Sequence, residues 1–366
     1  MFIAVNIIFP VSFTPGISTI SKVSGDNNHT TNLVAVAAQD KNKNSIVPLD
    51  QIVNGGPPPD GIPSIDNPIF ISVQEAEEFL EDSDLVVGLN INGDIRAYPL
   101  QILVWHEIVN DVVGKSPVAV TYCPLCFTNQ VFNRTLNDGQ ILEFGTSGKL
   151  YNSNLVMYDR TTKSLWSQAM SQAIVGKLVG VKLDRIPFDV SQWKDWKQLY
   201  PDSKVLSRDT GSSRPYGVDP YGEYYSSKDV LFPIAKHDDR LELKEIVIGF
   251  ENEGQYKAYK LLDVEKERVI NDQVNGKPIS LFSLNPFMAR AYSPIMVEEQ
   301  TALQFEYNAK NNTLVDKQSK SQWNFDGKAI DGQMKGKQLM RLPFDQGFWF
   351  EWIAFHPTTD LYNNGS

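Results

Sequence analysis

The amino-acid sequence predicts an α+β protein of two tandem duplicated lobes, with mostly antiparallel β-sheets and short helices. Three observations predict this class. Short apolar runs are bounded by Gly, Asn and Asp, which is typical of antiparallel strands and their turns. Apolar residues at helical spacing extend over only short stretches. An ordered set of short motifs also occurs twice along the chain, which indicates an internal duplication.

The duplication is visible when the chain is aligned with itself. Ala97-Tyr98 matches Ala258-Tyr259 at an offset of 161 residues. Later in each copy the segment 185–189 (RIPFD) matches the segment 341–345 (RLPFD) at an offset of 156 residues. The matches keep their order over more than a hundred residues, so chance similarity is a poor explanation. The period is too long for a solenoid and fits two packed α+β domains.

Composition and charge narrow the class of protein. The chain has 366 residues and 42% hydrophobic residues, enough for a globular protein with two cores. Its formal net charge is −10, and an acidic surface repels phosphate backbones. We therefore expect no nucleic-acid partner.

The domain plan follows from shifts in composition. Residues 1–64 are expected to be a signal-like segment and a low-order tail, because Met1–Phe13 is a short apolar run followed by polar and Pro-rich sequence. No basic segment precedes this run, so a truncated start is an open alternative, as is an ordinary buried segment. The first lobe is expected over 65–207, a linker over 208–244 and a second lobe over 245–366. This plan predicts an extracytoplasmic protein, secreted or at the cell surface, with an apolar N-terminus able to associate with the cell envelope.

The elements of the first lobe are predicted in order. Residues 73–80 (VQEAEEFL) indicate a short helix. Residues 85–89 and 94–98 indicate a hairpin around the Asn92-Gly93 turn. Residues 101–113 show helical spacing, and residues 116–122 indicate a strand that leads into the cysteines.

Each lobe is expected to end on a short helix with a Trp-x-x-Trp motif. The pairs are Trp193 with Trp196 and Trp349 with Trp352. Residues three apart share one face of a helix, so core packing is the expected role of these indoles.

The two cysteines of the chain, Cys123 and Cys126, form a CxxC motif in the first copy alone. The alignment places Leu284 opposite Cys123, Phe287 opposite Cys126 and Glu267 opposite His106. The second copy is also about four residues shorter where the first has residues 145–154. A purely structural feature tends to survive in both copies, so these differences point to a site in the first.

Three chemistries are open to this CxxC motif. Two thiolates two residues apart form half of a tetrahedral metal site, with His106 as third ligand and Glu107, Asp159 or water as fourth. Such donors suit a transition metal, zinc or copper. The cysteines can instead form a dithiol/disulfide couple or supply a nucleophile. A static disulfide, or two buried thiols, is the third alternative.

Other polar residues extend the predicted site. His106 is a candidate ligand or general base, with a buried histidine bonded to backbone as the alternative. Glu107 is a second candidate for acid–base chemistry. Lys149 and Ser147 are expected to form a polar hairpin turn, or, in the functional interpretation, to line a pocket over the cysteines. Tyr151 and Asn152 continue that polar edge as candidate ligand-binding residues.

The ordered motifs of the chain resemble domain-of-unknown-function family 3179. The resemblance runs from about Pro68 to Thr358 and implies a prokaryotic protein, often with an export signal, and no established activity. Phe127 stands where the family pattern commonly has glycine. The motifs that carry the resemblance are AYPL at 97–100, WHE at 105–107, PVAVTYCPLC at 117–126, SGKLYNS at 147–153, MYDR at 157–160 and LWSQ at 165–168.

The function that follows is an exported protein with a metal- or thiol-dependent site in the first lobe, redox or hydrolytic in its chemistry. The expected partner is a small molecule or a metal ion. Two other classes stay open: a metal- or ligand-binding module without turnover, and a structural cell-envelope protein with a CxxC disulfide. Whether the protein is an enzyme is undecided by the sequence.

Overall fold

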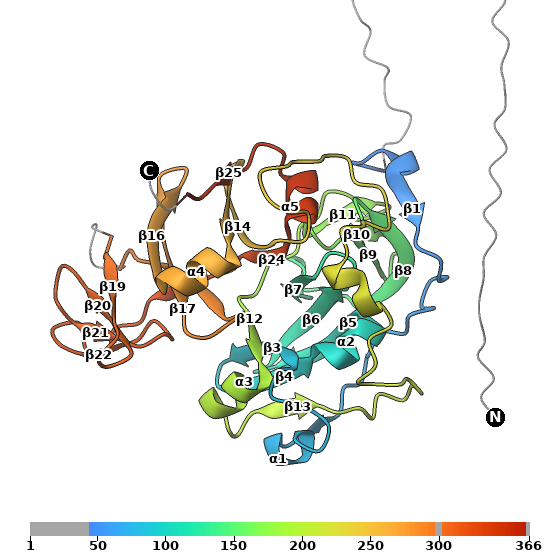
Figure 1. Ribbon diagram of the computed structural model, residues 1–366. Coiled ribbons are helices and arrows are strands. Elements are labelled where there is room, and N and C mark those ends of the chain that lie inside the picture. Colours follow the sequence, from blue (N-terminus) through green and yellow to red (C-terminus); the bar gives the residue numbers. More distant parts are fainter. Residues whose placement is uncertain (1–43, 297–301, 364–366) are drawn as a thin grey trace, which may run out of the picture. The chain divides into compact units, whose positions relative to one another are not determined.

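The fold is taken from a computed structural model that describes residues 44–296 and 302–363 (Figure 1). Residues from Asn44 onward form one compact unit. The signal-like run Met1–Phe13 lies outside the described residues. Within the predicted tail, residues 52–54 form strand β1 rather than an irregular segment. None of the helices among the described residues is long and apolar enough to cross a bilayer.

Three sheets contain the strands of the first half of the chain, residues 65–207. The first sheet has the order β12 (Asp189–Gln192), β3 (Leu85–Ile91), β4 (Asp94–Pro99), β13 (Lys204–Leu206), β2 (Phe70–Ile71). The second has the order β1 (Ile52–Asn54), β8 (Phe144–Tyr151), β9 (Asn154–Asp159), β10 (Leu165–Ser167), β11 (Gln172–Val175). The third, which also holds strands of the second half, has the order β25 (Asp360–Leu361), β15 (Gln255–Lys260), β14 (Ile246–Asn252), β24 (Asp345–Phe348), β7 (Thr128–Asn133), β6 (Ser116–Cys123), β5 (Ile108–Val113).

Two further sheets belong to the second half, residues 245–366. One has the order β16 (Val269–Val274), β17 (Lys277–Ser283), β18 (Ala289–Ser293), β23 (Met340–Leu342), and the other β19 (Phe305–Asn308), β20 (Thr313–Asp316), β21 (Gln322–Trp323), β22 (Ala329–Asp331). Among the named strands of the described chain, only the β13–β4 and β15–β25 pairs are parallel. The predicted α+β class with mostly antiparallel sheets is thus confirmed.

The helices are short and lie between strands. They are α1 (Val73–Ala76), α2 (Leu100–His106), α3 (Trp193–Leu199), α4 (Leu261–Glu267) and α5 (Trp349–Phe355), with 3-10 helices η1 (Leu49–Gln51) and η2 (Gly222–Ser226). Both Trp-x-x-Trp helices are confirmed as α3 and α5. Figure 1 shows α4 and α5 in the second half and α2 and α3 beside the strands of the first.

Two sequence-based predictions of helices are corrected. Helix α1 ends at Ala76 rather than Leu80, since after its Ser72 cap the chain tightens into a turn in which the N–H of Phe79 donates to the carbonyl of Ala76. The predicted helix over 101–113 ends at His106, because Glu107 adopts a left-handed φ of 58°. Residues 108–113 then form β5, whose β-branched side chains pair with β6.

The Asn92-Gly93 hairpin turn is confirmed between β3 and β4. Both residues have positive φ angles, 52° and 81°, as the tight turn between twisted strands requires. Glu253 and Gly254 occupy the same kind of turn between β14 and β15, with φ angles of 50° and 78°.

The order of elements from β3 to α3 recurs from β14 to α5, and individual contacts recur with it. The Tyr98 hydroxyl donates to Asp111 at 2.6 Å, and the Tyr259 hydroxyl donates to Asp272 at 2.8 Å. A side chain at Gly88 would collide with Trp196, as one at Gly249 would with Trp352. The division into two duplicated lobes stays a prediction, which this recurrence supports.

The two halves meet where β24 pairs with β7 through Gln346 and Asn129. This single pairing joins strands of both halves into the seven-stranded sheet. Phe348 and Phe350 of the second half consequently pack in the same buried cluster as Cys123 and Cys126. The cysteines therefore lie at the junction of the halves rather than inside the first half alone.

Candidate functional site

The cysteines are held in the turn between β6 and β7. Cys123 is the last residue of β6, and Cys126 lies two residues before β7. Both are free thiols, 1% and 0% exposed. Burial raises the pKa of the Cys126 thiol well above its ordinary value, so this sulfur is protonated near neutral pH.

Strand register corrects the alignment of this turn with the second half. Thr121 pairs with Gln130, whereas its counterpart Phe282 pairs with Arg290, so the second turn is one residue shorter. The residue opposite Cys126 is therefore Pro286 and not Phe287. Phe287 instead matches Phe127, and both have positive φ angles, 64° and 56°.

The hairpin of β8 and β9, which is four residues longer than the matching β19–β20 hairpin of the second half, reaches the two thiols. It joins β8 to β9 through Asn152 and Ser153, which take left-handed φ angles of 50° and 61°. The carbonyl oxygen of Ser153 lies 3.9 Å from the Cys123 sulfur. The side-chain amide of Asn154 donates to the Cys126 sulfur at 3.2 Å. The thiols, which the first half alone carries, are thus in contact with the longer of the two hairpins.

A buried cluster of hydrogen-bonded polar side chains, which we call the polar pocket, surrounds Cys126. The amide of Asn154 also donates to Gln168 Oε1 at 3.0 Å. The amide of Gln168 in turn donates to the hydroxyl of Thr121 at 2.8 Å and to the backbone carbonyl of Thr128 at 3.2 Å. All of these side chains are less than 2% exposed, so the pocket is closed to solvent.

The same positions are apolar in the second half. By strand register Thr121, Thr128 and Gln168 match Phe282, Met288 and Phe325. These three are buried, and two of them belong to the same apolar cluster of the second half. A fold that packs stably with apolar residues here does not need the polar set, which makes the polar set a functional candidate.

Glu351 of α5 enters this pocket from the second half, and sequence analysis missed it. Its Oε1 accepts from Asn154 at 3.3 Å, and the side chain is 4% exposed. Burial, followed by the neighbouring Cys126 and Asp345, raises its pKa well above the ordinary range. The available signal was a lone carboxylate in the apolar helix sequence WFEWIAF.

His106 is not brought to the thiols as a ligand. Its Nδ1 donates to the carbonyl of Pro63 at 2.7 Å, and its Nε2 accepts from the Tyr216 hydroxyl at 2.6 Å. Burial lowers the pKa of the ring, consistent with this neutral form. Among residues 44–296 and 302–363, no group of three or more His, Cys, Asp or Glu side chains is placed to hold a metal ion.

Glu107 lies apart from Glu351 at the end of α2. It is 8% exposed, and burial raises its pKa to about 8. Its charge affects the neighbouring Tyr221. The matching residue in the second half is Arg268, which has the same left-handed backbone. Glu107 is thus a buried acid that the first half itself contributes, close to the tyrosine-rich linker.

The predicted polar edge over the cysteines is only partly formed. Lys149 is exposed, away from the buried thiols, and Ser147 donates to the carbonyl of Val156 inside the β8–β9 hairpin. The expected turn at residues 146–149 is an irregularity within β8. Tyr151 packs edge-on against Phe355 at 5.6 Å, and Asn152 accepts from the backbone N–H of Ala235 at 2.9 Å. Of these four residues, Asn152 is the one that is hydrogen-bonded to the linker, through Ala235.

The linker, residues 208–244, covers the cysteine turn. The Tyr224 hydroxyl donates to the carbonyl of Leu125, between the two cysteines, at 2.7 Å. The ammonium group of Lys244 lies 3.4 Å from the centre of the Tyr224 ring and donates to Ser227 at 3.1 Å. Tyr225 stands edge-on to Phe127 at 6.2 Å. We call η2, with Tyr221 directly before it and Tyr224 and Tyr225 within it, the tyrosine strap.

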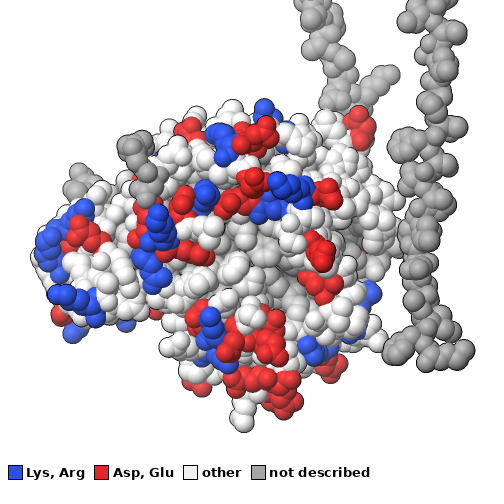
Figure 2. All heavy atoms as spheres, in the orientation of Figure 1, with Lys and Arg blue, Asp and Glu red and all other residues white. Residues whose placement is uncertain are grey.

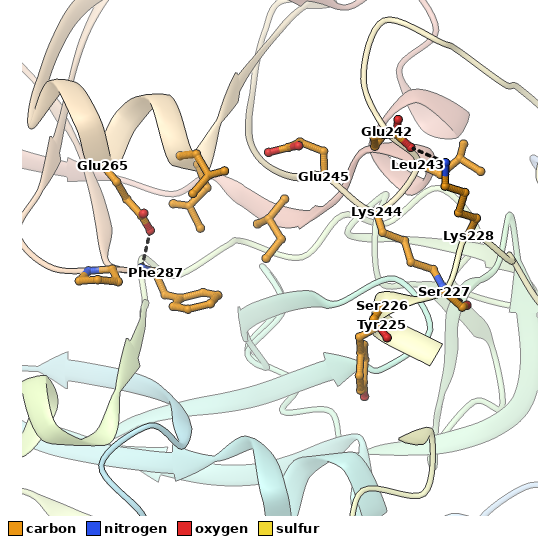
Figure 3. A pocket seen from close by; sticks show the side chains of 14 residues that line it. Tyr225, Ser226, Ser227, Lys228, Glu242, Leu243, Lys244, Glu245, Glu265 and Phe287 are labelled. Atoms are coloured by element: carbon orange, nitrogen blue, oxygen red, sulfur yellow. Dashed lines mark hydrogen bonds and ion pairs between the residues drawn. The ribbon is translucent and has the colours of Figure 1, made fainter. Parts of the chain in front are cut away.

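Two cavities border the tyrosine strap. The larger, about 480 Å³, is shown in Figure 3 and lies between the linker and α4, with Lys244 directed to Ser227. Glu265 accepts from the N–H of Phe287 at one end of it. The smaller, about 240 Å³, is lined by Tyr122 and Phe127. Tyr225 lines both of these cavities, and the cysteines line neither.

Surface charge is mixed around the site. Figure 2 shows acidic and basic side chains interspersed over this face, with a group of acidic side chains in the lower part of the view. The feature that sets the first half apart from the second is therefore the buried polar pocket, and not a surface of one charge.

Comparison with known proteins identifies a family and nothing more specific. A family model described as "Protein of unknown function (DUF3179)" matches residues 59–359, most of the chain. No curated protein and no solved structure matches the chain.

Proposed function

The chain belongs to the DUF3179 family of proteins of unknown function, and on this premise we propose that Cys123 and Cys126 form a thiol–disulfide redox couple. The observation that carries the proposal is the contact between the two thiols, found in the first half, and a hairpin that is longer there than its counterpart in the second half. The longer hairpin brings Ser153 and Asn154 onto the two thiols, at 3.9 and 3.2 Å. A polar pocket stands there in place of the apolar core of the second half.

The reaction is a two-electron exchange with a thiol or disulfide partner. In the oxidising direction, substrate thiolate attacks the Cys123–Cys126 disulfide and Cys126 leaves as a thiolate, which takes up a proton. A second substrate thiolate then attacks the substrate sulfur of the mixed disulfide and releases Cys123 as a thiolate, which takes up a proton. The substrate becomes a disulfide, and the protein gains two electrons and two protons. The reverse sequence reduces a substrate disulfide.

The two cysteines have different roles in this scheme. Cys126 is fully buried and receives the Asn154 amide, so it is the sulfur proposed to leave and return within the protein. Because its pKa is raised, its departure from the disulfide requires a proton. Cys123 ends a strand beneath the tyrosine strap and is the sulfur proposed to hold the substrate. The proline between them stiffens the turn.

Other expectations from the sequence remain proposals. A zinc or copper site would need ligands beyond the two thiols, since His106 is bonded to Pro63 and Tyr216. Hydrolysis, export and envelope association also stay predictions. Tandem duplication is supported by the recurring Tyr–Asp contacts at Tyr98 and Tyr259.

Equilibration in a thiol–disulfide redox buffer tests the proposal. The purified chain is incubated with mixtures of reduced and oxidised dithiothreitol, quenched in acid and weighed by mass spectrometry. We expect a reversible loss of two hydrogen atoms that maps to the peptide containing Cys123 and Cys126. Cys126→Ser should form no internal bond, and in a buffer of reduced and oxidised glutathione it should retain a mixed disulfide at Cys123. A dithiol that stays reduced in every buffer, or a bond that forms only after unfolding, contradicts the proposal. Elemental analysis of the same sample tests the metal alternative.

A further inference from the structure

The side-chain amide nitrogen of Asn154 has more acceptors within hydrogen-bond distance than it has hydrogens to donate. It contacts three acceptors: the Cys126 sulfur at 3.2 Å, Gln168 Oε1 at 3.0 Å and Glu351 Oε1 at 3.3 Å. A side-chain amide carries only two hydrogens. A third proton, on the carboxyl of Glu351 or the thiol of Cys126, is needed for every polar atom in this group to be satisfied.

The surroundings of Glu351 decide where that proton resides. Asp345 of β24 faces it and disfavours its charge, as does a Cys126 thiolate, whereas the Thr128 hydroxyl and Arg185 favour the charge. Burial outweighs the groups that favour the charge, so the pKa of Glu351 is raised and the neutral carboxyl is favoured. Arg185 is also paired with Asp345 at 2.5 Å, which limits its effect on Glu351.

We infer that Glu351 of the second half is the proton donor and acceptor for Cys126 in the redox couple of the first half. The inference rests on the proposed function. When substrate thiolate opens the disulfide, the Cys126 sulfur leaves with the electron pair and takes the proton of the Glu351 carboxyl. The carboxylate is then reprotonated from solvent. In the reverse direction, Glu351 accepts the proton of Cys126 as that sulfur attacks the mixed disulfide at Cys123.

The inference gives the second half a role in the chemistry. Its cysteine turn has no thiols, yet its helix α5 supplies a carboxyl to the thiols of the first half. The matching residue on α3 is Asp195, which is 9% exposed and whose pKa is also raised by burial. Pro286 stands opposite Cys126 in the second half, so Asp195 has no thiol there to serve. Asp195 is therefore a matched control for neutralising a buried helix carboxyl.

The experiment compares Glu351→Gln with Asp195→Asn in the full chain. The oxidised proteins are mixed with reduced dithiothreitol, and the rate of disulfide reduction is followed from pH 5 to pH 9. General acid catalysis contributes roughly 10²–10⁴-fold, so we expect Glu351→Gln to slow reduction by about 100-fold near pH 7. The inflection assigned to Glu351 should vanish from its pH profile. Asp195→Asn should keep the wild-type rate and profile.

A second set of measurements tests whether Glu351→Gln folds as the wild type does. Near-ultraviolet circular dichroism reports the packing of the buried tryptophans, and Glu351→Asp retains a carboxyl that should restore part of the rate. Infrared difference spectra between oxidised and reduced wild-type protein should contain a carboxylic-acid band that Asp195→Asn keeps and Glu351→Asp shifts.

The outcomes separate this inference from the function on which it rests. If wild-type protein forms no disulfide, both fail. If it does, while Glu351→Gln reacts at the wild-type rate with an unchanged pH profile, the role of Glu351 is overturned and the redox couple stands. Equal slowing by Glu351→Gln and Asp195→Asn would also overturn it, because a general loss of packing would then explain the effect.

Discussion

Arg185 of the first half forms an ion pair with Asp345 of the second half at 2.5 Å. The matching residues form the reciprocal pair, in which Arg341 of the second half donates to Asp189 of the first. Each half thus places its arginine on the aspartate of the other, as two subunits do across a two-fold axis. This reciprocity places Glu351, a few residues beyond Asp345, against the cysteine turn.

The aspartate with two guanidinium partners should matter more for stability than its counterpart. Asp189 is fully buried and holds both Arg290, at 2.8 Å, and Arg341. Their charges lower its pKa even though it is buried. Asp189→Asn leaves the buried Arg290 with the exposed Asp326 as its remaining charge partner, and we expect a loss of about 3 kcal/mol in the free energy of unfolding, the low end for a broken buried pair.

Urea denaturation measures that loss. Asp345 has one arginine partner, Arg185, whose side chain is 19% exposed. Asp345→Asn should therefore lower the free energy of unfolding by less, about 1–3 kcal/mol. Glu306→Gln breaks the exposed pair with Lys317 and should cost about 0–1 kcal/mol. Equal losses at Asp189 and Glu306 would contradict the assignment of Asp189 to a buried ion-pair network.

Gly347 allows β24 to approach the cysteine turn. An added Cβ there would lie 2.5 Å from the Thr128 hydroxyl and 3.2 Å from the carbonyl oxygen of Cys126. Gly347→Ala should therefore cost about 1–3 kcal/mol of stability and alter the reactivity of Cys126. The matching residue is Ser191, which already bears a side chain, so Ser191→Ala is the control. Denaturation curves and alkylation rates of both variants check the prediction, and two unchanged curves would refute it.

Loosening the tyrosine strap should expose the thiols. Tyr224→Phe removes the hydrogen bond to the carbonyl of Leu125 at 2.7 Å, worth about 1 kcal/mol. Alkylation by iodoacetamide should then quicken roughly fivefold, because 1.4 kcal/mol corresponds to a factor of ten. Tyr307→Phe removes an exposed hydroxyl contact with Asn312 and should leave the rate unchanged. The same rate in all three proteins would mean that reagents reach the thiols by another route.

Glu107 should make the stability of the protein fall as pH rises. Its pKa lies near 4.5 in the unfolded chain and is raised to about 8 in the fold by burial. Between these values the unfolded chain has released the proton and the folded chain retains it. The contribution is complete below about pH 4.5 and is lost as pH rises to about 8, at up to roughly 1.4 kcal/mol per pH unit.

Glu107→Gln should remove that dependence. Urea denaturation at several pH values should give a flatter curve for Glu107→Gln than for the wild type between about pH 5 and pH 8. Glu223→Gln, an exposed glutamate of the strap, should follow the wild type. A wild-type slope that persists in Glu107→Gln would assign the effect to other buried carboxyls.

Local elements were predictable where local rules decide them. The Asn92-Gly93 turn supplies two residues that tolerate positive φ, and the Trp-x-x-Trp helices present one apolar face. The helix predicted across residues 101–113 failed because helical spacing and short strands overlap in so brief a segment. Pairing of residues 108–113 with β6, a contact set by the neighbouring strand, decided between them.

The site was predictable in part for the same reason. Cys123 and Cys126 stood out because they occur in one half alone, and the contact of Asn154 with Cys126 supports that choice. Lys149 was a candidate only by its place in the sequence, and a two-residue irregularity in β8 leaves it exposed. Glu351 lies 225 residues from Cys126 in the sequence, and no local pattern connects them.

The sequence by itself determined the α+β class, the order of the recurring elements and the choice of the cysteine turn as the candidate site. These depend on periodicity, turn residues and repetition, all of which are properties of the chain read in order. Only the tertiary structure decided that His106 bonds to Pro63 and Tyr216 and that Glu351 shares the Asn154 amide with Cys126. Those partners are fixed by the packing of one half against the other, in which burial and strand register, and not distance along the chain, bring side chains together.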